Sequence, residues 1–262
     1  MKRILIISLL FTYMIAGEGF PALTFPELAQ DGYFPSVPAK AEDRIDFSYA
    51  SWFYDTDYSV LSAHYGNYYF GFKGLISGNI EIRGDQPSPE PVGTTAYYNT
   101  VLYAGRSWEF NGRWTANTKI KLLNERLFYA SAWGAAADAE AVFSFNARYR
   151  ALAGVENIGY MSALNEVPTR IPARYYVGGE VTFNVFILSL EAGLNRDLDT
   201  YYRFGARYVH PVFDISYSYD KIQMTHHIGA DVKWSKYRVG YGQFFHREGL
   251  GNPLMFTFGM QF

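Results

Sequence analysis

Five histidines are the residues of this chain best suited to proton transfer or metal binding: His64, His210, His226, His227 and His246. His226 and His227 are neighbours in a strand-like segment, so their side chains point to opposite faces and do not chelate one metal together. A hydrolase needs a histidine held by a carboxylate or amide beside a nucleophile or an activated water. No local spacing supplies that set, and the G-x-S-x-G motif does not occur. The sequence therefore predicts no catalytic residue, no metal site and no cofactor.

Charged residues of both signs recur on the polar face of segments that alternate between apolar and polar residues. The set is Lys73, Glu81, Arg83, Lys119, Lys121, Glu125, Glu140, Arg148, Arg150, Arg174, Glu180, Glu191, Arg203, Arg207, Asp231 and Arg238. We expect them to face the lumen of a β-barrel, where they form cross-strand ion pairs in a wet interior or line a conduction path. Mixed signs do not define a selective ring, which favours ion pairs.

The composition is that of a chain with many strands and tight turns. Aromatic residues make up 19% of it, with 23 Tyr and 21 Phe, and there are 24 Gly, whereas charged residues make up only 18%. The net charge of −2 argues against a nucleic-acid surface, and 0 Cys excludes disulfides and thiolate metal sites. Nothing after residue 17 reaches about eighteen consecutive apolar residues, which excludes a helical membrane protein.

The end of the chain, Leu254–Phe262, has the alternation of a strand with one apolar face. That face carries Leu254, Phe256, Phe258, Met260 and Phe262, opposite Met255, Thr257, Gly259 and Gln261. A strand that ends in an aromatic residue looks like the last strand of a bacterial outer-membrane β-barrel. Phe262 resembles the signal that the outer-membrane assembly machinery reads. A soluble β-sandwich would also have one apolar face, so alternation alone does not decide between them.

Strand-like segments continue along the chain from Arg44, about fourteen in all. They begin near Arg44, Tyr58, Tyr68, Ala96, Trp114, Ala137, Arg148, Arg174, Val185, Tyr201, Val212, Thr225, Lys236 and Pro253. Tight turns such as Asn111-Gly112 alternate with longer loops such as Gly84 to Thr95, a pattern typical of a transmembrane barrel whose long loops are extracellular. We therefore predict an all-β fold, a transmembrane antiparallel β-barrel of bacterial outer-membrane type. Pairing of the segment near Arg44–Phe53 with Leu254–Phe262 would close it.

Large aromatic residues occupy the apolar face beside the tight turns. They are Trp114, Phe145, Tyr149, Phe183, Phe186, Tyr208, Phe213, Trp234, Tyr237 and Phe262. Away from the turns this face changes to Ala, Val, Leu and Ile. Amphipathic rings prefer the membrane–water interface, so we expect a periplasmic-side aromatic girdle, which favours the barrel over the sandwich.

The chain before the barrel divides into two segments. Residues 1–17 begin with Lys2 and Arg3 and continue with an apolar run, Ile4 to Ile15, that is too short to span a bilayer as a helix. They predict a secretory signal peptide, with an uncleaved anchor as the alternative. Residues 18–43 contain four prolines and no alternation, so we expect a periplasmic segment or a small lumen plug. The barrel is predicted over residues 44–262.

Several segments between residues 95 and 262 carry a resemblance. They are Val155-Glu-Asn-Ile-Gly159, Ile171-Pro-Ala-Arg174-Tyr175, Leu188-Ser-Leu-Glu-Ala192, Tyr202–Tyr208 and His227–Tyr241. In this order they resemble the PorV/PorQ-like outer-membrane family. The resemblance implies a FadL-like fourteen-stranded barrel and service to type IX secretion or surface attachment. Members of that family usually begin with an Ala/Gly-rich hatch ending in an Asn-Pro-Ala-like motif, and residues 18–43 contain no such motif.

Two functions follow. The first, implied by the resemblance, is a non-enzymatic component of protein secretion or surface attachment, which would hold secretion-system or surface proteins through its loops and periplasmic turns. The Pro-rich stretches Gln86–Pro91 and Met161–Pro168 would supply contact surface or act as plain connectors. The second is a FadL-like or porin-like channel for small solutes, with hydrophobic solutes among the candidates. Both place the protein in the bacterial cell outer membrane, with lipid and the assembly machinery as partners and no nucleic acid.

Overall fold

The computed structural model describes residues 43–52, 55–82, 90–164, 166, 168–221, 224–246 and 252–262. The signal peptide predicted at residues 1–17, nearly all of the segment predicted at 18–43, and Arg83 lie outside the described residues. No helix among the described residues is long and apolar enough to cross a membrane.

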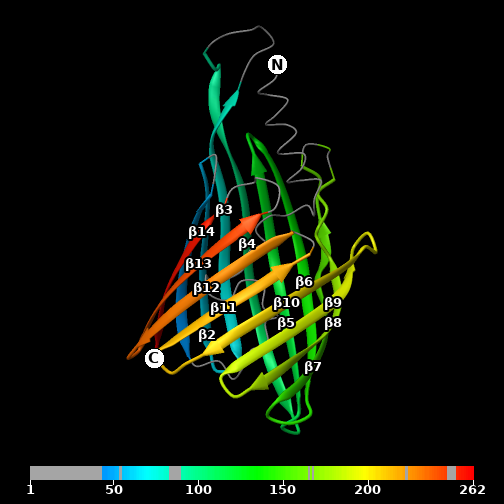
Figure 1. The fold of residues 1–262 in the computed structure, drawn as a ribbon. Helices are drawn as coiled ribbons and strands as arrows, with labels where there is room; N and C mark the ends of the chain where they lie inside the picture. The colour runs from blue at the N-terminus through cyan, green and yellow to red at the C-terminus, as the bar shows by residue number, and fades with distance from the viewer. Residues whose placement is uncertain are drawn as a thin grey trace.

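Fourteen antiparallel β-strands form a single closed barrel, as predicted (Figure 1). Their bounds are β1 Arg44–Trp52, β2 Thr56–Tyr65, β3 Tyr68–Ile82, β4 Gly93–Phe110, β5 Trp114–Leu127, β6 Ala130–Ser144, β7 Tyr149–Met161, β8 Arg174–Phe183, β9 Phe186–Asn195, β10 Thr200–Val209, β11 Phe213–Asp220, β12 Thr225–Trp234, β13 Tyr237–His246 and β14 Leu254–Gln261.

The barrel closes between its first and last strands. β1 pairs antiparallel with β14 from Arg44↔Gln261 to Ser51↔Leu254, and it pairs with β2 on its other side. Just past the strand end, the backbone N–H of Phe262 donates to the carbonyl of Asp43 at 3.0 Å. Every strand therefore has a hydrogen-bonded neighbour on both sides, as a sheet surrounded by lipid requires.

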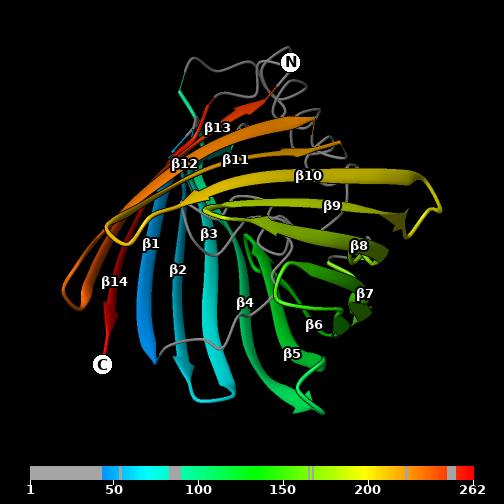
Figure 2. The same cartoon turned by 60° about the horizontal axis from the view of Figure 1, so that its bottom comes forward.

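The wall is uneven in height. Strands β3 to β7 contain 13 to 18 residues, whereas the other strands contain 8 to 10. In Figure 1 the long strands stand nearly upright, and β8 to β13 run diagonally across the wall. Figure 2 shows the ring of strands from the end that carries the tight turns. The β3–β4 hairpin projects beyond the rim, because β3 loses its pairing with β2 after Ser77 and β4 pairs with β5 only from Tyr97 onward.

Tight turns gather at one end of the barrel and long connections at the other, as the sequence predicts. The β4–β5 turn begins with Asn111 and Gly112, whose φ angles of 53° and 62° lie in the left-handed region that Gly and Asn adopt most readily. The long connections are residues 83–92, 162–173 and 247–253. Two connections at the long-loop end are exceptions, because three residues join β1 to β2 and only Phe128 and Tyr129 join β5 to β6.

Side chains alternate between a lipid-facing and an inner face. In β9, Phe186, Leu188 and Leu190 are exposed on the outside, whereas Ser189 and Glu191 are buried inside. In β14 the predicted outer residues Leu254, Phe256 and Phe258 are exposed, and Met255 and Thr257 are buried. A continuous apolar exterior on a closed barrel is suited to lipid and not to water.

One strand begins well before its predicted position. β6 was expected near Ala137 but starts at Ala130. In its first half the inner face carries only Ala and Gly, and the outer face carries Ser131, Ala135 and Ala137 beside Trp133, so the segment has little of the apolar–polar contrast that reveals a strand. The preceding turn also lacks a Gly or Asn signal, because Phe128 itself adopts the left-handed conformation, with a φ of 55°.

The two faces of the wall should respond differently to a new charge. Leu190→Arg places a cation in the lipid-facing surface near mid-strand and should lower the free energy of unfolding by about 2–4 kcal/mol. Thr182→Arg, on the neighbouring strand, adds the same side chain at a half-buried lumen position and should cost much less. Urea titration of the refolded protein in lipid vesicles, read by heat-modifiable mobility, measures both. Equal losses would mean that the faces are assigned wrongly.

Candidate functional site: the barrel lumen

Most of the charged residues predicted for the lumen lie on the inner face of the wall. These are Lys73, Lys119, Lys121, Glu125, Glu140, Arg150, Arg174, Glu180, Glu191, Arg203, Arg207, Asp231 and Arg238. Each occupies the strand parity opposite to the exposed apolar residues, so the alternation of each strand directs these side chains inward.

Two predicted lumen residues lie elsewhere. Glu81 is exposed on the part of β3 that projects beyond the rim, where an irregularity between Ser77 and Ile80 also shifts the strand register. Arg148 is exposed in the β6–β7 turn and not within β7, which starts at Tyr149. In that turn the side chain of Asn146 accepts the backbone N–H of Arg148 at 2.8 Å. Both predictions were wrong because strand ends and bulges leave little trace in the alternation.

Arg203 of β10 is the centre of the most deeply buried charge network. Its Nε lies 2.7 Å from Oδ2 of Asp220, and its Nη1 lies 3.5 Å from Oε1 of Glu191. Asp220 and Glu191 are only 0% and 1% exposed. The phenol of Tyr201 also donates to Glu191 at 2.9 Å. The Arg203 guanidinium therefore pairs with carboxylates on both neighbouring strands. These ion pairs and hydrogen bonds offset the desolvation free energy of the buried charges.

Tyrosine–glutamate pairs recur around the lumen. Besides Tyr201, Tyr97 donates to Glu125 at 2.6 Å and Tyr176 donates to Glu140 at 2.9 Å. The donors come from β4, β8 and β10 and the acceptors from β5, β6 and β9, so these bonds are spread over the wall from β4 to β10. The sequence does not reveal these pairs, because a tyrosine on the polar face of a strand looks like any other half-buried aromatic residue.

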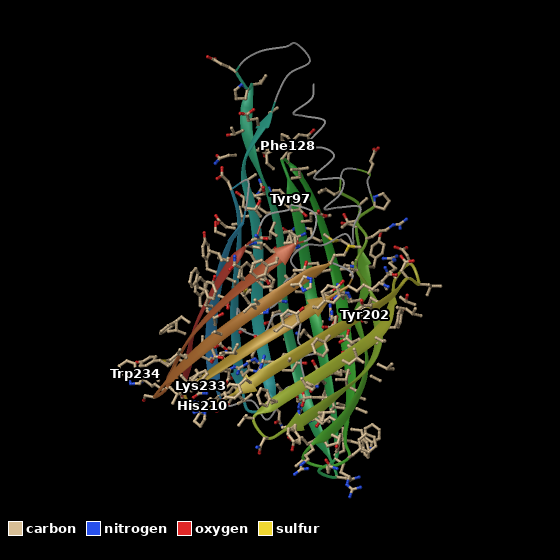
Figure 3. All side chains as sticks on the ribbon, viewed as in Figure 1. Tyr97, Phe128, Tyr202, His210, Lys233 and Trp234 are labelled. Atoms are coloured by element: carbon tan, nitrogen blue, oxygen red, sulfur yellow. The ribbon has the colours of Figure 1, made fainter. Side chains whose placement is uncertain are left out.

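The tight-turn end of the lumen holds charge pairs that are more open to water. Lys233 binds Asp214 at 2.8 Å, and the lysine side chain is 34% exposed. Arg150 pairs with Glu180 at 3.3 Å, and Arg238 pairs with Asp46 at 3.0 Å. Figure 3 labels Lys233 near this end, beside the outward-pointing Trp234. The inner face at this end is thus wet and charged, with most charges neutralised locally.

Towards the long-loop end the inner face is apolar on one side of the barrel, from β13 through β1 to β6, whereas the Arg203 network lies at the same end on β9 to β11. A buried cluster there includes Leu75, Leu123, Phe244 and Met255 together with the tyrosines Tyr58, Tyr97 and Tyr103. The alternation predicts a wet interior lined by charges, and this apolar cluster was not predicted. Its signal is present: the inner positions of β14 and β13 include Met255 and Phe244, apolar residues on the face predicted to be polar.

The histidines do not assemble into a catalytic or metal-binding set. His227 packs inside against Phe244, with ring centroids 4.6 Å apart. His226 lies on the outer side, where its Nδ1 is 2.8 Å from the Tyr217 hydroxyl. Among the residues that the structure describes, no group of three or more His, Cys, Asp or Glu could hold a metal ion.

Aromatic residues surround the outside of the barrel near the tight turns. The structure places beside these turns Trp114, Phe145, Tyr149, Phe183, Phe186, Tyr208, Phe213, Trp234, Tyr237 and Phe262. Neighbouring rings contact one another, as in Phe186–Tyr208 at 5.3 Å and Tyr237–Phe258 at 6.0 Å between centroids. A second aromatic group near the opposite rim, Tyr175, Tyr202 and Tyr219, was not singled out from the sequence.

Comparison with known proteins supports the fold. No protein-family model matches the sequence, and no curated protein matches it. Among solved structures, the Pseudomonas putida toluene transporter TodX has a TM-score of 0.55 at 10% identity, over 92% of this chain and 96% of its own. The monoaromatic hydrocarbon channel CymD gives 0.54 at 10% identity, over 95% and 98%. Acinetobacter baumannii Omp33 gives 0.50 at 9% identity, over 84% and 98%.

The chain folds as a bacterial outer-membrane β-barrel. The closed fourteen-stranded wall, the apolar exterior and these structural neighbours together place the protein in the outer membrane. At 9–10% identity the likeness concerns the fold alone. The fourteen-stranded architecture implied by the PorV/PorQ resemblance is therefore present, whereas membership of that family has no support from the comparisons.

The Arg203 network should be far more sensitive to substitution than an exposed ion pair. Arg203→Ala removes the cation shared by Glu191 and Asp220 and should lower the free energy of unfolding by about 3–5 kcal/mol. Arg170→Ala is the matched control, because Arg170 pairs with Asp197 at 3.6 Å with both side chains mostly exposed, and its loss should cost about 0–1 kcal/mol. Denaturant unfolding in vesicles compares them. Similar small losses for both variants would contradict the central role of Arg203.

Proposed function

We propose that this protein is a non-enzymatic channel that lets small, uncharged solutes cross the outer membrane. The observation that carries the proposal is the inner face of the closed wall. It carries neutralised charge pairs at the tight-turn end, and at the long-loop end it carries an apolar, tyrosine-rich cluster on one side and the paired Arg203 network on the other. A solute with both polar and apolar groups finds matching partners along this path.

The pairing of the lumen charges favours uncharged solutes over ions. A selective ion pathway presents rings of one sign or of carbonyl oxygens. Here the cations of Arg203, Lys233 and Arg238 each lie against a carboxylate. Their fields largely cancel within a few ångströms, so an ion would lose hydration without gaining a strong counter-charge.

The named activities of the structural neighbours agree with this proposal. TodX is a toluene transporter and CymD a monoaromatic hydrocarbon channel, and both share the barrel architecture with this chain. The secretion or attachment role implied by the PorV/PorQ resemblance stays a prediction. Of its two proposed contact loops, Gln86–Pro91 lies mostly outside the described residues, and Met161–Pro168 begins at Met161, which is buried in the apolar lumen cluster.

A thiol placed in the lumen should allow the passage to be blocked. The chain has no cysteine, so Lys233→Cys introduces a single reactive site at the wet end of the lumen. A bulky, membrane-impermeant thiol reagent should label this variant and slow the swelling of proteoliposomes in an isotonic pentose solution. Val232→Cys is the matched control: it is the adjacent residue, it faces lipid, and the same treatment should leave swelling unchanged.

Unmodified protein sets the reference for this test. Vesicles containing it should swell faster in the pentose solution than protein-free vesicles. If they do not, the channel proposal is wrong, and co-purification of secretion partners from native membranes would then support the alternative. If modification of Val232→Cys slows swelling as much as modification of Lys233→Cys, the solute does not pass through the lumen.

A further inference from the structure

A short segment between β7 and β8 turns back into the mouth of the barrel. Residues 168–173, here called the inner strap, lead into β8. Ile171 is 1% exposed and belongs to the apolar lumen cluster, and Pro172 and Ala173 are also buried. A compact bend, in which the N–H of Ala173 donates to the carbonyl of Ile171 at 2.9 Å, directs this part of the segment into the barrel.

The strap reaches well away from the strands that it connects. The hydroxyl of Thr169 donates to Oε2 of Glu125 at 2.9 Å, and Glu125 lies on the inner face of β5. β6 separates β5 from β7, so at about 4.8 Å per strand this contact lies about 10 Å around the wall from β7. At its other end, Arg196 of the β9–β10 loop reaches the carbonyl of Ile171 at 3.5 Å. The strap therefore lies across the inner side of several strands.

The wall behind the strap has small side chains. Along the upper half of β6 the inner positions are Ala132, Gly134 and Ala136, and both alanines are buried in the same cluster as Ile171. These positions leave room for an additional layer of chain inside the barrel. Larger inward residues on this strand would occupy the space that the strap fills.

The side chain of Asn157, here called the latch, holds the strap to the wall of the barrel. Opposite Asp138, β7 carries one extra residue, a bulge at which Asn157 adopts a φ of 56°. The side-chain amide of Asn157 donates to the carbonyl of Pro172 at 3.1 Å, and its oxygen accepts from Lys121 at 2.5 Å. Lys121 also pairs with Asp138 at 2.6 Å, and Asp138 accepts the N–H of Asn157 at 2.8 Å.

From these contacts we infer that the inner strap, fastened by Asn157 and Thr169, narrows the passage and sets the largest solute that crosses it. This inference rests on the proposed channel function and assigns its size selectivity to particular residues. A segment that was only a connector would have no reason to place an isoleucine, a proline and an alanine inside the barrel. The two fastenings act from different strands, so each contributes separately to holding the strap in the passage.

The test loosens each fastening while the backbone of the barrel is preserved. Asn157→Gly removes the latch side chain and keeps a residue that tolerates a positive φ. Thr169→Val removes the hydroxyl that binds Glu125 and keeps the side-chain shape. The control is Asn111→Gly, the same substitution at a positive-φ position in the β4–β5 turn at the far end of the barrel. Heat-modifiable mobility confirms that each protein is folded in liposomes.

Swelling rates in a pentose and in an uncharged trisaccharide measure the size limit. For Asn157→Gly and Thr169→Val, the ratio of trisaccharide to pentose rates should rise roughly three- to tenfold, the change in open population expected when one hydrogen bond between the strap and the wall is lost. Asn111→Gly should keep the unmodified ratio. If both strap variants fold and also keep that ratio, the inference is overturned. If unmodified protein passes neither sugar, the channel proposal fails instead.

Discussion

The pairing of β1 with β14 is the interaction on which the rest of the molecule depends. In the hydrocarbon layer a strand edge would leave a row of N–H and C=O groups without water, at a cost of several kcal/mol for each group. Closure removes both edges at once and joins residues far apart in the sequence, such as Arg44 and Gln261, which are 217 positions apart. Inner side chains stabilise the same seam. The hydroxyl oxygens of Ser48 and Thr257 lie 2.7 Å apart in a hydrogen bond, and Arg238 forms an ion pair with Asp46.

Closure also turns one face of every strand into the wall of a narrow interior. A charge there cannot turn away into bulk water, so it needs a partner on a neighbouring strand. Arg203 meets this need for two carboxylates, and tyrosine hydroxyls supply further donors to Glu125 and Glu140. The contacts that stabilise these buried charges also tie strands together: Arg203 joins adjacent strands, and Tyr176 of β8 reaches Glu140 of β6 across β7. The side chains that form these stabilising ion pairs are therefore the same ones that line the interior.

Alternation predicted the barrel well because lipid imposes the same rule on nearly every strand. The strand starts at Arg44, Tyr68, Trp114, Arg174 and Thr225 were predicted at the observed residue. The predictions were wrong where a segment does not alternate between apolar and polar residues. The inner face at the start of β6 has only small apolar residues, Glu81 lies beyond the rim, and Arg148 lies in a turn. The tyrosine–glutamate pairs could not be predicted either, because alternation gives the face of a residue but not its neighbour across strands, which depends on the register of pairing.

The inner strap shows how far such local exceptions depend on one another. The bulge at Asn157 breaks the alternation of β7, and the Ala and Gly positions of β6 remove its contrast, so both look like defects in a strand pattern. In the closed barrel they face the same volume. The bulge turns an amide towards Pro172, and the small residues leave space for Ile171. Both features are needed to hold the strap inside the mouth of the barrel: the Asn157 amide binds it, and the small inner residues of β6 leave the space that it fills. The sites where the sequence pattern is weakest are thus the sites where the wall is adapted to something other than lipid.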